Sequence, residues 1–556
     1  MFVLNLEAMN GYQSVTAQKC VLFMKSRTTA VNTAIFIALL VCFQFSRQPS
    51  FPVKDPFHHG EFLAAAITVL EDPTFDGEPY TIHGAADFFP ALFVNMLNPS
   101  REMLLANTLI IYPLLSMLTV VFTTLAAVRL ARRFGADPLI LLPFILASGL
   151  CVGWRDLLFG LSLFLFAGLV PDRHRSDGRY MAQILFGFVI GFSIYWSFNR
   201  GVTGLVAFGL PTLWLTMRDP RFFVSIATVL VSFMTMGALL PGISIGGYFE
   251  NFTTLLETST QWAYPTSAQT IFWTLLVLAI VAASSILTLV RVRQRALSDD
   301  NIVLLFTILI ASGLFAKIGL GRIDESHVIM GAWLPLLALS LMLPTPNFEA
   351  PTKLIVGLIC LVSVFFAGVV ADNRPALPFL AIILALALFF PETRARRYVM
   401  YAMIALCVSV PVLLVGKTAY NVYKGRYDWL VLHITNLPDA KRAVMPGLLW
   451  SSETIVESGA DCVFDLSNTG LINAVANLPA CSQFTYPVYA GLQHEGKLIT
   501  DLTRADPPVI VYRSDFWSYA IDGRNMAERF PALDAEIMKL YPREVCKHDY
   551  CLRFQR

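Results

Sequence analysis

Two carboxylates stand just after the first hydrophobic run, and a carboxylate beside a reacting hydroxyl can take its proton as a general base. Asp55 begins the stretch "DPFHHGE" and Glu61 ends it. If residues 56–70 form a helix, Glu61 lies near its start on the same side as His58. Plainer interpretations exist for both carboxylates. Asp55 before Pro56 is typical of a helix N-cap, and Glu61 could lie on a solvated helix face.

Three histidines and another carboxylate in this region could bind a metal ion or a substrate. His58 and His59 are adjacent, and His83 and Asp87 follow in "YTIHGAADFFP". Adjacent histidines point different ways on a helix, so at most one of them could share a metal with Glu61. The stretch has no HExxH or similar spacing. We therefore expect no cofactor, with a divalent metal as the alternative, and favour hydrogen bonds to sugar hydroxyls or phosphate.

Charged residues gather again in "GLGRIDESH". Arg322 is the favoured phosphate ligand, because a guanidinium can donate two parallel hydrogen bonds to phosphate. His327 could add a second donor. Alternatively, Arg322 and Asp324 form a surface ion pair that orients the loop. Arg200 in "FNRG" and Arg155 in "GWRD" are secondary candidates, for which snorkelling at the end of a membrane span is an equal alternative.

The elements that must position these residues are hydrophobic helices. The chain has 556 residues, of which 56% are hydrophobic and 14% charged, and its mean hydropathy is +0.61. This composition is typical of a polytopic α-helical membrane protein. The net charge of +2 gives no sign of a nucleic-acid partner. The apolar runs predict about 13 transmembrane helices, at 28–46, 104–128, 139–153, 157–170, 181–198, 202–217, 222–240, 271–290, 302–316, 328–343, 354–370, 375–390 and 398–416.

The basic residues predict how the helices are oriented. If the N-terminus lies inside, the arginine clusters fall into inner loops, as the positive-inside rule requires. An odd number of spans then places the C-terminus outside, together with the large first loop at 47–103. The apolar runs contain no ionisable residue, which counts against an ion-coupled transporter. The predicted helix at 56–70 is too short to span, and its apolar stripe indicates that it lies along the membrane surface.

The composition becomes polar and mixed from about Thr418. We expect residues 1–417 to form the membrane domain and 418–556 a small outer α/β domain. The segments "DCVFDLS", "PPVIVYR" and "CLRFQ" are typical of buried strands, with helices at "TGLINAVANL" and "NMAERFPALDAEIMKLY". Four cysteines in an outer domain favour two disulfides over free thiols. The preferred pairing is Cys462–Cys481 and Cys546–Cys551.

This organisation resembles the GT-C superfamily of membrane glycosyltransferases. The long first outer loop with an early acidic residue, the many spans and the outer C-terminal domain are all similar. So are "DPFHHGE…YTIHGAADFFP" in the first loop, "GRIDESH" in a later loop, and "VFDLSNTGLINAVANLPACSQFTYPVY" in the C-terminal domain. The resemblance implies an enzyme of the bacterial inner membrane, with a polyprenyl-phosphate sugar as donor and an acidic residue of the first loop as base.

Such a transfer, if it inverts the configuration at the anomeric carbon, requires two kinds of group. A carboxylate must take the proton of the acceptor hydroxyl, for which Asp55 is the first candidate and Glu61 the second. Cations must hold the lipid phosphate as it leaves, for which Arg322 is favoured. We therefore expect a glycosyltransferase that acts at the outer bilayer surface on a glycan, lipid or protein acceptor. The alternatives are a surface-polysaccharide ligase or polymerase and, less favoured, a lipid or sugar transporter.

Overall fold

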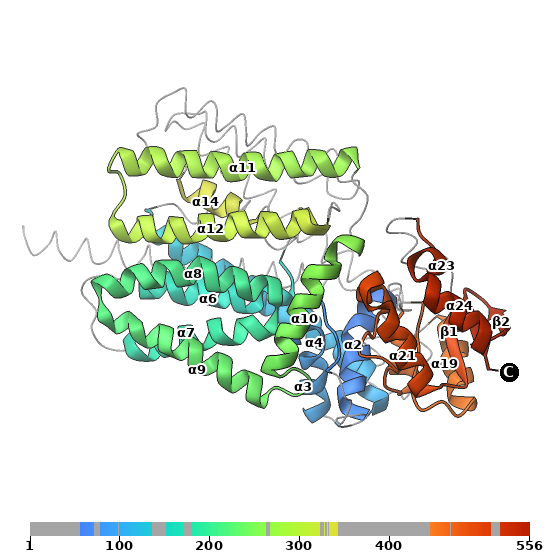
Figure 1. The fold of residues 1–556 in the computed structure, drawn as a ribbon. Helices are drawn as coiled ribbons and strands as arrows, with labels where there is room; N and C mark the ends of the chain where they lie inside the picture. The colour runs from blue at the N-terminus through green and yellow to red at the C-terminus, as the bar shows by residue number, and fades with distance from the viewer. Residues whose placement is uncertain are drawn as a thin grey trace, which may run out of the picture.

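The protein is predominantly helical in the computed structural model (Figure 1). The structure describes residues 56–71, 78–97, 99, 101–135, 152–170, 179–262, 267–322, 327–328, 331, 333–342, 445–467, 469–512 and 523–555. The predicted spans at 28–46, 354–370, 375–390 and 398–416, and most of 139–153, lie outside these residues. The expected helix count and the domain boundary at 417 therefore stay predictions.

Each of the other predicted spans contains a helix. These helices are α4 (Arg101–Arg133), α6 (Leu157–Leu169), α7 (Arg179–Trp196), α8 (Phe198–Arg218), α9 (Phe223–Leu239), α11 (Ala268–Arg293), α12 (Asp299–Arg322) and α14 (Trp333–Met342). Among the described residues, three stretches are long and apolar enough to cross a membrane, namely Leu114–Arg133, Pro220–Leu239 and Asp299–Gly321. The chain is thus a helical membrane protein with several spans, as expected.

The membrane helices pack closely where their facing residues are small. On α7, a Cβ added at Gly187 would lie 2.4 Å from the carbonyl oxygen of Ser225, and one at Gly191 would lie 2.6 Å from that of Val229. Glycine at both positions therefore lets α7 and α9 lie against each other. The opposite side of α9 exposes large apolar side chains, including those of Phe223, Leu230, Val231 and Met234. These side chains suit contact with lipid tails.

The first loop forms short helices rather than an extended connection. They are α2 (Pro56–Glu71), η1 (Ala85–Asp87) and α3 (Phe89–Leu97). The bounds of α2 match the predicted helix closely, and its position along the membrane surface stays a prediction, but its apolar side chains pack against protein. Every residue from Leu63 to Ile67 is at most 1% exposed. A helix buried around its circumference has protein on all sides, and no solvated face is left for Glu61.

The C-terminal segment forms a small lobe of helices around a three-stranded sheet, at the right of Figure 1. Its strands β1 (Val509–Tyr512), β2 (Arg543–Lys547) and β3 (Tyr550–Phe554) have the order β1-β3-β2, with both pairs antiparallel. The predicted strand around Val463 contributes only isolated bridges, to Ala480 and, from Asp465, to Val511. The remaining elements are α19 (Pro446–Glu457), α20 (Leu471–Ala476), η7 (Pro487–Ala490), η8 (Leu492–His494), α21 (Glu495–Ala505), α23 (Met526–Arg529) and α24 (Pro531–Leu540).

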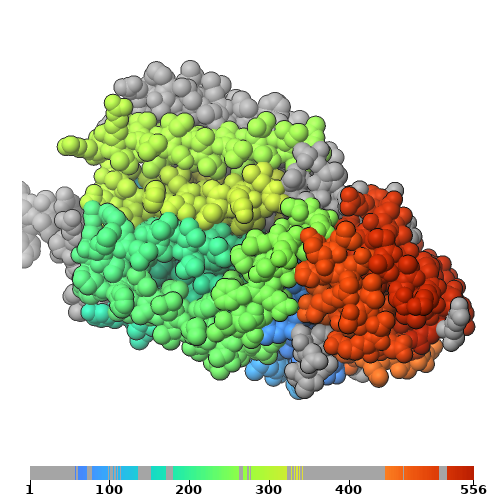
Figure 2. All heavy atoms as spheres, viewed as in Figure 1, coloured from blue at the N-terminus to red at the C-terminus, as the bar shows by residue number. Residues whose placement is uncertain are grey.

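One continuous apolar core joins the first loop to this C-terminal lobe. It contains Phe57, Leu63 and Ile67 from α2 and Leu471, Tyr486 and Val511 from the lobe. The lobe also lies against α10 (Ile245–Thr258) and η5 (Ser259–Trp262), as Figure 2 shows. Gln261 beside α10 accepts hydrogen bonds from Leu492 N at 2.8 Å and from Arg529 at 3.1 Å. The lobe is therefore docked on the helical region.

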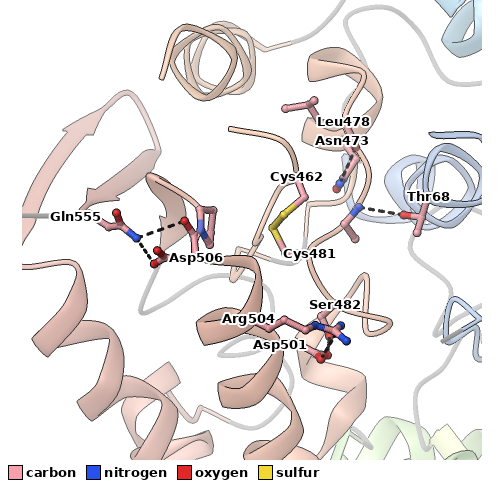
Figure 3. Close-up of a disulfide and its surroundings, with 12 residues drawn as sticks. Thr68, Cys462, Asn473, Leu478, Cys481, Ser482, Asp501, Arg504, Asp506 and Gln555 are labelled. Carbon is pink, nitrogen blue, oxygen red and sulfur yellow. Dashed lines mark hydrogen bonds and ion pairs between the residues drawn. A yellow bond between two sulfur atoms is a disulfide. The ribbon is translucent and has the colours of Figure 1, made fainter. Parts of the chain in front are cut away.

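Both expected disulfides are present in the lobe. Cys462 is bonded to Cys481, and Cys546 to Cys551. The first joins two segments that approach α2, where Thr68 accepts a hydrogen bond from Ala480 N at 3.0 Å (Figure 3). It therefore fixes the chain directly next to Ala480, which contacts the first loop.

Non-reducing peptide mapping of the protein from its native membrane should recover both disulfides. Disulfides form and persist in oxidising compartments, so their recovery would support the expected position of the C-terminal lobe outside. Complete alkylation of all four cysteines in the folded protein without reductant would contradict both the pairing and the orientation.

Candidate functional site

Two carboxylates from the first loop converge on one arginine at the junction between the helical region and the C-terminal lobe. Arg155 belongs to η3 (Trp154–Asp156), at the start of α6. A single guanidinium nitrogen of Arg155 lies 3.1 Å from Glu61 Oε2 and 3.2 Å from Asp87 Oδ1. The side chains of Glu61 and Asp87 are 6% and 2% exposed, and that of Arg155 is 17% exposed. The site is therefore a partly buried cation between two buried carboxyl groups.

His83 completes this cluster. Its Nδ1 lies 3.0 Å from Asp87 Oδ2 and 3.8 Å from Glu61 Oε1, and its backbone N–H also donates to Asp87 at 3.2 Å. Burial raises the pKa of Asp87 to about 6, and the positive charge of Arg155 opposes this rise. The carboxyl group of Asp87, which orients the imidazole of His83, therefore titrates not far below neutral pH.

Arg155 keeps hydrogen-bonding capacity for which the described residues offer no partner. Within the described part of the chain, Arg155 Nε and Trp154 Nε1 are buried donors without a hydrogen-bond partner. A buried donor that lacks an acceptor costs about 1–3 kcal/mol. The guanidinium also lies over the rings of Trp154 and Phe62, at 4.6 and 5.8 Å from their centroids. Unsatisfied N–H groups on two consecutive residues beside aromatic rings suit an oxygen-rich anion such as phosphate.

A second ion pair holds Arg155 in place. The neighbouring Asp156 accepts hydrogen bonds from Gly153 N at 3.0 Å and from Arg200 Nε at 2.9 Å. Arg200 is itself 8% exposed and lies over the ring of Phe315, 5.5 Å from its centroid. Because Asp156 is tied to α8 in this way, the one-turn helix that carries Arg155 has a fixed position.

The loop that carries His83 and Asp87 is fixed by the junction of α7 and α8. Gly84 has φ = 94°, and a Cβ there would lie 2.6 Å from the carbonyl oxygen of Tyr195, so this turn requires glycine. Phe198 N donates to the carbonyl of His83 at 3.0 Å. Tyr112 of α4 donates its hydroxyl to the backbone of Asp87 at 3.0 Å. The turn at Gly84 therefore aims both side chains at Glu61.

The structure brings together Glu61, His83 and Asp87 from the predicted site. Arg200 forms an ion pair with Asp156, the residue after Arg155. Asp55 and Asp324 lie outside the described residues. The backbones of His58 and His59 are in α2, and Arg322 ends α12, but their side chains are also outside the description. His327 lies where its carbonyl oxygen would be 2.6 Å from a Cβ at Gly319 of α12. The roles expected for these residues stay predictions.

Sequence reasoning ranked Arg155 only as a secondary candidate, and it missed Trp154 and Tyr489. Tyr489 of the C-terminal lobe donates its hydroxyl to Glu61 Oε1 at 3.1 Å. The motif "GWRD" was a signal for Arg155, because an arginine beside an aspartate at the start of a hydrophobic run is unusual. Tyr489 carries no such signal, since nothing near it in the sequence indicates a contact with the first loop.

The carboxylates and the imidazole also have the spacing of a metal site. Glu61, His83 and Asp87 each offer a ligand atom, and these atoms lie within 4.8 Å of one another. Two carboxylates and an imidazole suit several divalent ions. However, Arg155 donates to both carboxylates, so a cation would have to displace this guanidinium. A second group in the described chain, with Cys546, Cys551 and Glu544, lacks free thiolates because its cysteines form a disulfide.

Two solved structures are similar to the chain over most of its length. ArnT from Cupriavidus metallidurans in the apo state has 13% sequence identity and a TM-score of 0.49, with 95% of this chain and 98% of that chain covered. ArnT bound to undecaprenyl phosphate has 14% identity and a TM-score of 0.44, with the same coverage. Neither a family model nor a curated protein matches the chain. At this level of similarity the function rests on the residues of the site.

Proposed function

We propose that this protein is a membrane glycosyltransferase of the GT-C type, which moves a sugar from a polyprenyl-phosphate donor to a glycan, lipid or protein acceptor. The observation that carries the proposal is the buried cluster of Glu61, Asp87, His83 and Arg155. It combines a candidate base with a cation that has unused donors. The motifs of the first loop, which resemble those of the GT-C superfamily, support it. The proposal places the site at the outer surface of the bacterial inner membrane.

Glu61 is the candidate base within the described residues. Its oxygens each accept one hydrogen bond, from Arg155 and from Tyr489. A carboxylate has about four acceptor positions, so Glu61 keeps capacity to accept the proton of an acceptor hydroxyl. The acceptor oxygen then bonds to the anomeric carbon, and the bond between that carbon and the phosphate oxygen breaks. The electron pair leaves with the polyprenyl phosphate. Asp55 remains the alternative base.

Arg155 is the candidate ligand for the departing phosphate. Arg155 Nε and Trp154 Nε1, which lack a partner among the described residues, can donate hydrogen bonds to phosphate oxygens. The negative charge on these oxygens grows as the bond to the sugar breaks. Because the site is buried, these donors act in a medium of low dielectric constant, where the interaction is stronger than in water. The expected contribution of Arg322 and His327 belongs to the same proposal, as a second contact with the donor.

A polysaccharide ligase or polymerase is the second candidate, because it would also use arginine and histidine on a lipid-linked donor. The buried Glu61 favours the transferase, since a ligase does not need a carboxylate in the first loop.

A plainer possibility is that the cluster is an ion-pair network that only holds the first loop in place. Such a network would explain the paired atoms but gives no role to the donors of Trp154 and Arg155, which lack a partner among the described residues, as does Trp196 Nε1.

The test compares membranes from cells that express the full chain or its Glu61→Gln variant. Both receive polyprenyl phosphates that carry a labelled hexose or pentose. We expect label to pass from the donor to an envelope fraction with the wild-type chain only. Transfer of a whole glycan from a polyprenyl pyrophosphate, and of no single sugar, would favour the ligase.

The same assay tests the proposal that the enzyme needs no metal. Because Arg155 already supplies positive charge to both carboxylates, transfer should persist in EDTA. Loss of transfer on chelation, with recovery on addition of Mg²⁺, Mn²⁺ or Zn²⁺, would instead assign Glu61, His83 and Asp87 as metal ligands.

A further inference from the structure

We propose that Tyr489 of the C-terminal lobe is a positioning residue that holds Glu61 in its working orientation, so that transfer requires the lobe to be docked on α2. This inference rests on the proposed function, in which Glu61 is the base. The two side chains are 428 positions apart in sequence, yet the phenol donates to Glu61 Oε1 at 3.1 Å. The residues are 3% and 6% exposed.

Tyr489 completes the set of bonds that fixes the carboxylate. Arg155 of η3 holds Oε2 and Tyr489 holds Oε1. A base contributes to catalysis only if its oxygen lies within hydrogen-bond reach of the proton that it abstracts. With one oxygen held from the membrane region and the other from the lobe, the orientation of Glu61 depends on both parts of the chain.

The docking of the lobe on α2 is close enough to fix this bond. A Cβ at Gly60, next to Glu61, would lie 1.9 Å from the carbonyl oxygen of Thr469, so only glycine allows this approach. Tyr80 N donates to the carbonyl of Gln483 at 2.8 Å. The Cys462–Cys481 disulfide precedes the segment that carries Tyr489. The distance from α2 to this segment is therefore set by backbone contacts.

Tyr486 provides a matched comparison for Tyr489. The two rings are stacked with centroids 5.8 Å apart, and both residues are buried. Tyr486 donates to the backbone carbonyls of Phe57 at 2.6 Å and Thr469 at 3.0 Å. Its hydroxyl therefore supports the docking through these backbone carbonyls. Replacement of either tyrosine by phenylalanine removes one buried hydroxyl, but only the change at 489 removes a bond to Glu61.

The experiment measures kcat, the KM for the labelled polyprenyl-phosphate sugar and thermal unfolding in the purified full chain. Tyr489→Phe should lower kcat roughly tenfold, a modest part of what a positioned base contributes, with little change in KM. Tyr486→Phe should lower the unfolding temperature by a similar amount to Tyr489→Phe but leave kcat within about twofold of the wild type. Combined with Glu61→Gln, Tyr489→Phe should cause no further loss of kcat, because it acts through Glu61.

Two results would overturn the inference. One is equal kcat in Tyr489→Phe and Tyr486→Phe. The other is the same fractional loss from Tyr489→Phe whether residue 61 is Glu or Gln. A wild-type chain without transfer activity would contradict the proposed function instead. In that case thermal unfolding tests the contact between Tyr489 and Glu61. If the double variant lowers the unfolding temperature by the sum of the shifts in Tyr489→Phe and Glu61→Gln, the two side chains are not coupled.

Discussion

Glu61→Gln is expected to reduce sugar transfer by roughly 10²-fold or more, the usual contribution of a positioned general base. Glutamine has nearly the same size, and its single amide oxygen can accept the hydrogen bond from Arg155. The Tyr489 hydroxyl, which lies against the other carboxylate oxygen, can rotate to accept a hydrogen bond from the amide NH2. It cannot take a proton at neutral pH. The variant should therefore fold and bind the donor while kcat falls, which kinetics with the labelled polyprenyl-phosphate sugar and a donor-binding assay would measure together.

Asp55→Asn is the matched variant, because Asp55 is the other candidate base. Asparagine caps helices about as well as aspartate, so this change separates a catalytic role from a capping role. We expect transfer to change little if Glu61 is the base. A large loss in Asp55→Asn with an active Glu61→Gln enzyme would move the base to Asp55. Full activity in both variants would leave the proposed mechanism without a base and would favour the ligase or the transporter.

The local elements of the site could be predicted from the sequence because their signals are local. The Asp-Pro start and apolar stripe predicted a helix at 56–70, and α2 spans Pro56–Glu71. The disulfide pairing was predicted equally well. The burial of α2 could not be predicted. Its residues resemble those of a surface helix, and only the C-terminal lobe, encoded hundreds of residues later, covers its outer side.

The membership of the site shows the same division. Glu61, His83 and Asp87 were singled out because unusual ionisable groups gather in a chain with few charges. Their closeness, however, depends on contacts between distant segments, such as the bond from Phe198 N to the carbonyl of His83. Arg155 was ranked low because a basic residue at the end of an apolar run usually snorkels. Its burial against two carboxylates appears only when η3 is packed on the first loop.

Arg155→Gln is expected to cause the second large effect, on both stability and donor binding. It leaves Glu61 and Asp87 as two buried carboxyl groups without their shared cation, and loss of one partner of a buried ion pair costs about 3–5 kcal/mol. The 17% exposure of Arg155 places the expected cost at the lower end of that range. Denaturant unfolding would measure this cost. Donor binding, measured at a temperature where the variant is folded, should weaken roughly tenfold or more, because charge-assisted hydrogen bonds contribute about 1.5–3 kcal/mol each.

Arg155→Lys separates charge from geometry. Lysine keeps the positive charge between the carboxylates, so most of the stability should return. It lacks the planar fork that a guanidinium offers to phosphate, and it has no donor at the position of the unpartnered Nε. Donor binding should therefore stay weak in this variant. Wild-type binding with lysine would show that only the charge matters. If Arg200→Gln weakened binding while Arg155→Gln did not, the phosphate contact would belong to Arg200, and the unused donors of η3 would need another ligand.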